Sequence, residues 1–513
     1  MERNWITRPE QGGAAIFERG LRYHRAGDLQ QAEACYRQAL TFDPAHADSL
    51  HFLGLIAFQI GRYDLAVAQI GTAIKLRPQA AHYHCNLANA LFHQARLDEA
   101  EAAYREALRL APNDPIAHNN LGNVLRAAGH LDRAEGSYRT ALRLKPDFPD
   151  AHNGLGVNLS SLGRYAEAEA CYREAVRLAP DYAEAHYNIA GTLLLAGRFD
   201  EAWPEFEWRW KVTEDRLSAR DFAQPIWQGE DISGKVILLH AEQGLGDTLQ
   251  FCRYAPLVAA RGAGVVLEIQ PPLQGLLSTL AGVENLVMQG DPLPQFDLHC
   301  PLMSLPRAFG TKLETIPAEV PYLKADPVLV ARWSDRVSGF DGLRVGLVWA
   351  GNPRRFSAEL SAVDRRRSIA LEQFAPLAAL PGLVLISLQK GEAAAEIDSA
   401  PPGLVIHDWT HELDNFADTA ALIDTLDLVI SVDTSVAHLA GALGRPVWLL
   451  NRFDTCWRWL LEREDSPWYP GLRQFRQPRP GDWDSVLEKV GVALKQSIQA
   501  HRRTLSVAGG TGT

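Results

Sequence analysis

A 34-residue period runs through the first two fifths of the chain and constrains its fold more than any other feature. A small residue, an alanine, a bulky residue and a closing proline each recur at this spacing. The four series are Gly20, Gly54, Ala88, Gly122, Gly156 and Ala190; Ala32, Ala66, Ala100, Ala134, Ala168 and Ala202; Tyr36, Ile70, Tyr104, Tyr138, Tyr172 and Phe206; and Pro44, Pro78, Pro112, Pro146 and Pro180. Small residues let two helices pack closely, the bulky side chain fills the space beside them, and proline ends the second helix. Residues 1–211 are therefore predicted to form an α-solenoid of six paired-helix units without an insertion.

This pattern resembles the tetratricopeptide repeat, whose concave groove takes a peptide or a protein. Asn86, Asn120 and Asn188 share one position on the first helix of their units, and a ladder of amides there would hydrogen-bond the backbone of an extended peptide. The alternative is that these amides are solvated or bridge neighbouring repeats. Histidines recur two residues earlier, but adjacent repeats place them too far apart for one metal ion. These histidines are His84, His118, His152 and His186.

The chain after the repeats alternates strand and helix patterns, which predicts parallel sheets. The sixth unit ends in Phe206-Glu-Trp-Arg-Trp210, which suggests docking on the next domain, and residues 212–234 lack the Gly/Ser composition of a flexible linker. Residues 235–330 and 331–500 are predicted to form two Rossmann-like lobes that face each other across a cleft. Strands are expected at Lys235–His240, Val265–Ile269, Phe296–Cys300, Arg344–Trp349, Leu383–Leu388, Leu404–His407, Leu426–Ile430 and Val447–Leu450. Residues 501–513 are predicted to be a disordered tail.

One stretch of the second lobe is suited to a phosphate. After the strand that ends at Ile430, small and apolar residues recur at helical spacing from Asp433 until Gly444 and Pro446. Backbone N–H groups near Thr434 to Val436, together with the hydroxyls of Thr434 and Ser435, would suit an anion at the carboxyl end of a parallel strand. His438 lies one helical turn after Thr434 and could face the same ligand. The alternative is that Asp433 or Thr434 only caps a helix and that His438 is structural.

The first lobe carries a glycine-bearing turn after its first strand. Gln243, Gly244 and Gly246 belong to this turn, which ends at Asp247, and a helix is expected from Thr248 to Ala260. The turn is not a full GxGxxG, and Asp247 in place of a third glycine argues against a dinucleotide site.

The two motifs together resemble the GT-B glycosyltransferases of the heptosyltransferase type. They are Gln243-Gly-Leu-Gly-Asp247 in the first lobe and Asp433-Thr-Ser-Val-Ala-His438 in the second. The fusion to tetratricopeptide repeats resembles bacterial protein glycosyltransferases, including those that modify flagellin, and in layout the O-GlcNAc transferases. This resemblance implies a nucleotide-activated sugar donor held mainly by the second lobe, with acceptor binding at the first lobe and along the solenoid.

The resemblance also implies residue roles. Asp247 is similar to the general base that takes the proton of an acceptor hydroxyl, with inversion at the sugar; the alternative is an N-cap of the helix at Thr248. Asp433, Thr434, Ser435 and His438 match the donor-phosphate loop, although Ser435 stands where heptosyltransferases often carry glycine.

Further donor contacts are predicted from the residues that follow strands. Lys390 could neutralise the leaving phosphate, the alternative being a solvated turn lysine, and Asn352 could touch donor or acceptor. The run Arg365–Ser368 could supply an arginine to the donor, although such charge runs are usually solvated.

Composition argues against several classes of function. The net charge of −11 argues against nucleic acid as the main partner, since binding it would need a basic face. Six scattered cysteines without a CxxC pair indicate reduced thiols, and no apolar run is long enough to span a membrane. With no apolar signal region at its N-terminus, the protein is expected to be cytoplasmic. No metal and no cofactor beyond the nucleotide-sugar substrate is expected, because Asp482-Trp-Asp484 reads as helix capping.

The sequence thus predicts a metal-independent, inverting glycosyltransferase that modifies a protein presented by the repeats, with a flagellin-like surface protein favoured. One rival is an interaction scaffold with a degenerate transferase half. The other is a lipid or polysaccharide transferase recruited through the repeats. The donor's base and sugar, the acceptor residue, the oligomeric state and whether the transferase half is active stay open.

Overall fold

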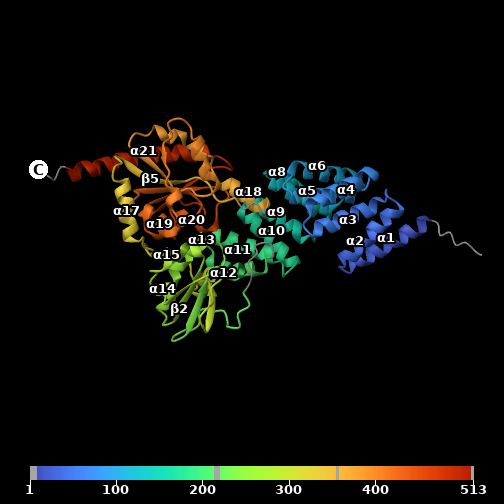
Figure 1. Cartoon of the computed structure of the whole chain (residues 1–513), viewed down its shortest axis with the longest axis horizontal. Coiled ribbons are helices and arrows are strands. Elements are labelled where there is room, and N and C mark those ends of the chain that lie inside the picture. Colours follow the sequence, from blue (N-terminus) through green and yellow to red (C-terminus); the bar gives the residue numbers. More distant parts are fainter. Residues whose placement is uncertain (1–8, 213–219, 354–357, 510–513) are drawn as a thin grey trace, which may run out of the picture. The chain divides into compact units, whose positions relative to one another are not determined.

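The computed structural model describes residues 9–212, 220–353 and 358–509 (Figure 1). These residues fall into two compact units, one that ends at Asp181 and one that begins at Tyr182 and holds nearly all of the rest.

Twelve α-helices among the described residues form the predicted six pairs. They are α1 Pro9–Arg25, α2 Leu29–Phe42, α3 Ala47–Gln59, α4 Tyr63–Leu76, α5 Ala81–His93, α6 Leu97–Leu110, α7 Pro115–Ala127, α8 Leu131–Leu144, α9 Pro149–Ser161, α10 Tyr165–Leu178, α11 Ala183–Leu195 and α12 Phe199–Phe206. The repeat series pack as expected: a Cβ on Gly122 would lie 2.7 Å from the Tyr138 ring, and one on Gly156 would lie 2.5 Å from the Tyr172 ring. Glycine is therefore required where each of these rings packs against the first helix.

The first lobe is a four-stranded parallel sheet in the order β3-β2-β1-β4. Its elements are β1 Val236–His240, α13 Leu245–Phe251, α14 Ala255–Ala259, β2 Gly264–Ile269, α15 Gln274–Leu277, β3 Asn285–Met288, β4 Leu298–Pro301 and α16 Leu305–Ala308. Leu238, Val266 and Val287 form the core of one face, against which Phe222 and Phe296 pack. Sequence patterns missed β3, because only one of its four residues is fully buried and the strand therefore lacks a clear apolar run.

The second lobe is a six-stranded parallel sheet in the order β10-β9-β8-β5-β6-β7. Its elements are α17 Pro327–Val337, β5 Leu343–Val348, α18 Ala358–Arg367, β6 Leu383–Ser387, β7 Ile406–His407, α19 Phe416–Asp424, β8 Leu428–Val432, α20 Ser435–Ala442, β9 Val447–Asn451, β10 Leu472–Arg476 and α21 Trp483–Gly509. Strand β10 was also missed, because Arg473, Gln474 and Arg476 leave Leu472 and Phe475 as its two apolar residues. In the core, sheet residues such as Val345 and Ile430 belong to one cluster with Val486, Val490 and Leu494 of α21.

Two predicted boundaries change. The expected tail is wrong over residues 501–509, because α21 continues as a helix to Gly509; residues 510–513 lie outside the described residues. The end of the solenoid at 211 does not coincide with the division between the compact units, because the sixth repeat belongs to the unit with the two lobes.

Six aromatic residues join the sixth repeat to both lobes, and we call them the aromatic junction. They are Phe199, Trp203 and Phe206 of α12, Phe251 of the first lobe, and Trp457 and Trp468 of the second. The Trp203 indole is buried and donates to the Thr311 carbonyl at 2.7 Å. The expectation that the sixth unit docks on the next domain is thus confirmed.

The predicted packed connector is described in part, since residues 213–219 lie outside the described residues. Beyond them, Trp227 is buried and its backbone N–H donates to the His299 carbonyl at 2.8 Å. Among the described helices, none combines the length and the apolar character that a bilayer span requires.

Replacing Trp203 by alanine should weaken the second unit. The substitution removes a buried indole and leaves a cavity where three parts of the chain meet, so we expect a loss of about 3–5 kcal/mol of unfolding free energy. Urea unfolding followed by tryptophan fluorescence and circular dichroism measures it. Phe42→Ala, at a side chain that is 48% exposed, is the control, and an equal loss in both variants would contradict a special role for the junction.

Candidate active site

Each lobe has one topological switch point, where neighbouring strands of the sheet lead to connections that run in opposite directions. It lies between β1 and β4 in the first lobe and between β5 and β8 in the second. Ligands of open parallel sheets bind at the carboxyl ends of the strands at such points. Both sequence motifs follow switch-point strands, Gln243–Asp247 after β1 and Asp433–His438 after β8.

The two motifs meet directly within the second unit, where α13 and α20 lie side by side (Figure 1). A Cβ on Gly246 would lie 3.1 Å from Cδ2 of His438 and 3.4 Å from Cα of Ser435. The N-terminal turns of α13 and α20 therefore pack against each other, and glycine is the residue that permits this distance.

Asp247 lies in the first turn of α13 and not at its N-cap. The helix begins at Leu245, so the expected start at Thr248 is wrong and Gly244 is the N-cap. One carboxylate oxygen of Asp247 accepts from the Gly244 backbone N–H at 2.9 Å, and the other accepts from Arg458. Each oxygen has two lone pairs, so both retain the capacity to accept one more hydrogen bond.

Arg458 belongs to the second lobe and is buried between the lobes. Its guanidinium also donates to Oε1 of Gln250 at 2.7 Å, on the same helix as Asp247. Burial lowers the pKa of Arg458, but the carboxylates of Asp247 and Asp433 contribute to raising it above its usual value. Arg458 is thus a charged residue close to the predicted base and to the donor loop, and sequence patterns gave no signal for it.

The donor loop has the predicted strand–turn–helix geometry. Thr434 is the N-cap of α20 in an extended conformation, and Ser435 is the first helical residue. The hydroxyls of Ser431 and Thr434 lie 3.0 Å apart. Asp433, Thr434 and Ser435 are each partly exposed, so a ligand can reach this end of the helix.

The arginine run contributes one side chain to the second switch point. Arg367 donates from Nη1 to the Asp433 carbonyl at 3.0 Å, and its Nη2 lies 2.8 Å from Asp364. A Cβ on Gly351, which follows β5, would lie within 2.6 Å of this guanidinium. Nε of Arg367 is buried without a hydrogen-bond partner in the described part of the chain. The guanidinium therefore lies between the two switch-point loops with a donor to spare.

Arg452, which sequence patterns missed, follows β9 at the same edge of the sheet. In the described structure its Nε and Nη1 are buried and lack a hydrogen-bond partner, although Nε lies 3.5 Å from Asp454. Asp454 also pairs with Arg366 at 3.0 Å. Each of these arginines lies close to a carboxylate, so what the group offers a phosphate is hydrogen-bond donors and not a net positive charge.

The predicted contact of His438 with the donor is wrong. The side chain is buried, stacks on Trp459 with ring centroids 5.2 Å apart, and places Nδ1 2.9 Å from the Tyr469 hydroxyl. Burial lowers the pKa of His438 to about 3, so the ring is neutral near pH 7. His438 is a packing residue against α13, as the alternative held.

Lys390 and Asn352 follow strands as expected, but their surroundings differ. The Lys390 ammonium donates to the carbonyls of Thr410 and Leu413 and so holds the loop after β7 instead of being merely solvated. Because the residue is exposed and an ammonium has three N–H donors, its contact with the leaving phosphate stays a prediction. Asn352 is exposed beside Gly351. Gln243 contributes its backbone carbonyl, which accepts from the Gln270 side chain at 2.8 Å.

The amide ladder is not free for a peptide throughout. Asn86 lies 2.8 Å from Nε2 of His51 in the preceding repeat, which is the bridging role of the alternative. Asn120 accepts from its neighbour Asn119 at 3.1 Å, and Asn188 lies on α11 in the other compact unit. Three of the repeat histidines bond a proline carbonyl six residues earlier, each at 2.9 Å; these are His84, His118 and His152.

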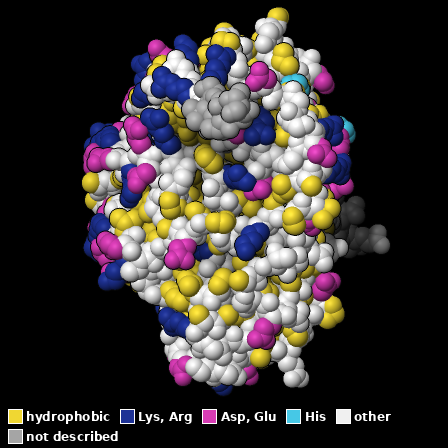
Figure 2. Space-filling view, turned by 90° about the vertical axis from the view of Figure 1, so that its left-hand side faces the viewer, with side chains coloured by type: hydrophobic (Ala, Val, Ile, Leu, Met, Phe, Trp, Pro, Cys, Tyr) yellow, Lys and Arg dark blue, Asp and Glu magenta, His cyan; other side chains and the backbone are white. Residues whose placement is uncertain are grey.

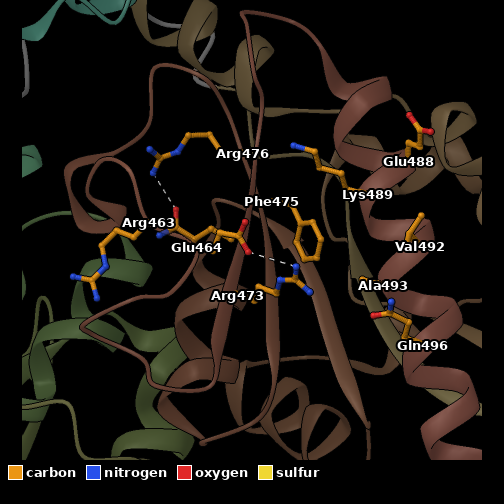
Figure 3. A pocket seen from close by; sticks show the side chains of 11 residues that line it. Arg463, Glu464, Arg473, Phe475, Arg476, Glu488, Lys489, Val492, Ala493 and Gln496 are labelled. Atoms are coloured by element: carbon orange, nitrogen blue, oxygen red, sulfur yellow. Dashed lines mark hydrogen bonds and ion pairs between the residues drawn. The ribbon is translucent and has the colours of Figure 1, made fainter.

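A cavity of about 470 Å³ lies away from this site, between edge strand β10 and α21 (Figure 3). Arg463, Arg473, Arg476 and Lys489 share its lining with Glu464 and Glu488. Arg463 already pairs with Asp465 at 2.6 Å, and Arg476 donates to the Leu460 carbonyl. Because β10 is not a switch-point strand, we do not assign the donor to this cavity.

Two further observations concern the surface charge and the candidate metal ligands. Basic and acidic side chains are interspersed on the face of the molecule in Figure 2. In the described ranges, no group of three or more His, Cys, Asp or Glu residues is arranged to hold a metal ion.

Both halves of the chain match models of known protein families. The glycosyltransferase family 9 (heptosyltransferase) model matches residues 414–450, which contain the donor loop. Tetratricopeptide-repeat models match residues 17–70, 53–115, 103–136, 122–160 and 158–207. The chain is a fusion of tetratricopeptide repeats with a domain similar to glycosyltransferase family 9.

Two curated relatives share parts of this fusion. Protein FlbA of Caulobacter vibrioides is 28% identical over 316 residues, which cover 56% of this chain and 52% of FlbA. The probable UDP-N-acetylglucosamine–peptide N-acetylglucosaminyltransferase SEC of Arabidopsis thaliana is 34% identical over 67 residues, 13% of this chain and 7% of SEC. The chain thus spans about half of FlbA. Among solved structures, the type IV pilus biogenesis factor PilW is 22% identical, with a TM-score of 0.37, over 40% of this chain and 96% of PilW.

Replacing Gly246 by valine should force the two motifs of this glycosyltransferase domain apart. The added side chain meets His438 and Ser435, and overpacking of this kind costs about 1–3 kcal/mol. The melting temperature and the rate of sugar transfer should both fall. Gly136→Ala, on a helix where a Cβ meets nothing within 4 Å, is the control; an unchanged Gly246→Val variant would show that the contact of α13 with α20 is dispensable.

Proposed function

We propose that this glycosyltransferase moves a sugar from a nucleotide-activated donor to a hydroxyl of a protein that the repeats recruit. The observation that carries the proposal is the meeting of Asp247 with the Asp433–Ser435 loop at two facing switch points. We favour a flagellin-like surface protein as acceptor, and a GT-B enzyme that needs no metal or cofactor and acts in the cytoplasm. Six free thiols support the cytoplasmic location, and the name of the relative SEC describes a peptide acceptor.

The chemistry follows from the placement of charges. The donor's phosphate binds at the N-terminus of α20, where backbone N–H groups, the Thr434 hydroxyl and Arg367 offer hydrogen bonds. The acceptor oxygen attacks the anomeric carbon while Asp247 takes its proton, and the bond from that carbon to the phosphate oxygen breaks. The nucleotide leaves with the electron pair, and a single displacement of this kind inverts the anomeric centre.

A thermal-shift screen with UDP, GDP, ADP, CDP and CMP tests the donor site. A nucleotide at a hundred times its Kd should stabilise the protein by about 2.7 kcal/mol. Thr434→Ala and Arg367→Met should lose this stabilisation, whereas Arg463→Met, which changes the cavity beside β10, should keep it. A folded protein that responds to no nucleotide would favour the scaffold with a degenerate transferase half.

Asp247→Asn tests the base. Loss of the proton acceptor should lower kcat by about 10²–10⁴-fold while nucleotide binding is kept, since the donor loop is untouched. The measurement is nucleotide release in the presence of the acceptor, with Glu464→Gln as the control. Near-normal turnover would mean that Asp247 only links the lobes through Arg458, and turnover that needs a lipid or polysaccharide instead of a protein would favour the second rival.

A further inference from the structure

The switch point of the first lobe, where the fold would place a ligand, is occupied by a side chain of the sixth repeat. Arg209 lies in the 3-10 helix η1, Glu207–Lys211, directly after α12, and its side chain is completely buried. It reaches Glu242, which follows β1, and Ser304, which follows β4. These are the two loops that border the switch point.

The hydrogen bonds of Arg209 are fully used. Nε and Nη2 donate to the Glu242 carboxylate at 3.0–3.1 Å, and Nη2 also donates to the Ser304 hydroxyl at 2.7 Å. Nη1 donates to Glu207 at 2.9 Å and to the Phe206 carbonyl at 3.2 Å. Glu242 in turn accepts from the backbone N–H of Met303 at 3.0 Å. A bidentate pair of this kind fixes orientation as well as charge.

This network is directly connected to the predicted base. Glu242 precedes the Gln243–Asp247 turn without an intervening residue. Its side chain's contacts with Arg209 and Met303 hold that end of the turn, together with the hydrogen bond from Gln270 to the Gln243 carbonyl. The other end is fastened by Arg458, which holds Asp247 itself. The backbone between Glu242 and Asp247 is thus held at both ends by arginines from outside the first lobe.

We propose that Arg209 is a positioning residue for sugar transfer, which holds Glu242 and thereby sets the place of Asp247 opposite the donor loop. The inference rests on the proposed function. By this proposal the sixth repeat contributes a residue that sugar transfer depends on, which agrees with the finding that this repeat belongs to the second compact unit. The first lobe's switch point then anchors the repeat, and the acceptor hydroxyl must approach from the side of Asp247.

The test uses the full chain with Arg209→Met, Glu242→Gln and the double variant. Lys211→Met is the matched control, because Lys211 lies on the same 3-10 helix but contacts the Trp208 ring instead, at 3.8 Å. Hydrogen exchange should be at least about tenfold faster at the amides of residues 243–247 in both single variants, and unchanged in β5 and β8. With the donor found in the nucleotide screen, kcat should fall about ten- to a hundredfold with KM for the donor within about twofold.

The double variant separates positioning from stability. Arg209→Met leaves the buried Glu242 carboxylate without its partner, and adding Glu242→Gln removes that unpaired charge, so the melting temperature of the double variant should lie above that of Arg209→Met, while kcat stays low. Recovery of kcat together with the melting temperature would overturn the proposal, as would unchanged exchange at residues 243–247. If the wild-type chain turns over no donor, the proposed function fails instead, and the exchange measurement alone decides whether Arg209 anchors the turn.

Discussion

The packing of α13 against α20 through Gly246 is the contact on which the arrangement of the lobes depends. It brings the N-terminal turns of two helices together, and the positive ends of two helix dipoles repel each other. Two carboxylates, Asp247 on one helix and Asp433 before the other, supply negative charge at this point, and both contribute to raising the pKa of Arg458, which donates to Asp247. Because the Asp247 carboxylate already caps the N-terminus of α13, an anionic leaving group here would be stabilised mainly by the N-terminus of α20.

The sequence predicted the parts of the fold that repeat or alternate, because those parts are specified by neighbours along the chain. The 34-residue series located six helix pairs, and the contacts of Gly122 and Gly156 with tyrosine rings are the reason that the period exists. Apolar runs located eight of the ten described strands, since a strand buried on both faces must be apolar throughout. The two strands that were missed carry polar or charged residues.

The predicted side-chain roles that the structure overturns or restricts are those that distant residues decide. His438 has the right spacing for a ligand, yet Trp459 and Tyr469 bury it. Lys390 follows a strand, yet two carbonyls from the next loop hold its ammonium. Asn86 lies on the expected helix, yet His51 of the preceding repeat occupies its amide. Spacing along the chain predicts the position of a residue on its helix or strand. Tertiary packing determines whether the polar atoms of its side chain are free to bind a ligand.

The two switch points differ in whether their arginine has a hydrogen-bond donor left for a ligand. Each has an arginine between its loops, Arg209 in the first lobe and Arg367 in the second. Arg209 faces two carboxylates and a hydroxyl, so its charge and its donors are satisfied within the protein. Arg367 faces one carboxylate and one carbonyl, and its buried Nε has no partner among the described residues. Because a buried donor without a partner is costly, the second switch point would gain from an incoming anion and the first would not, which supports the proposal that the sugar donor binds beside Arg367 while the first lobe holds the base.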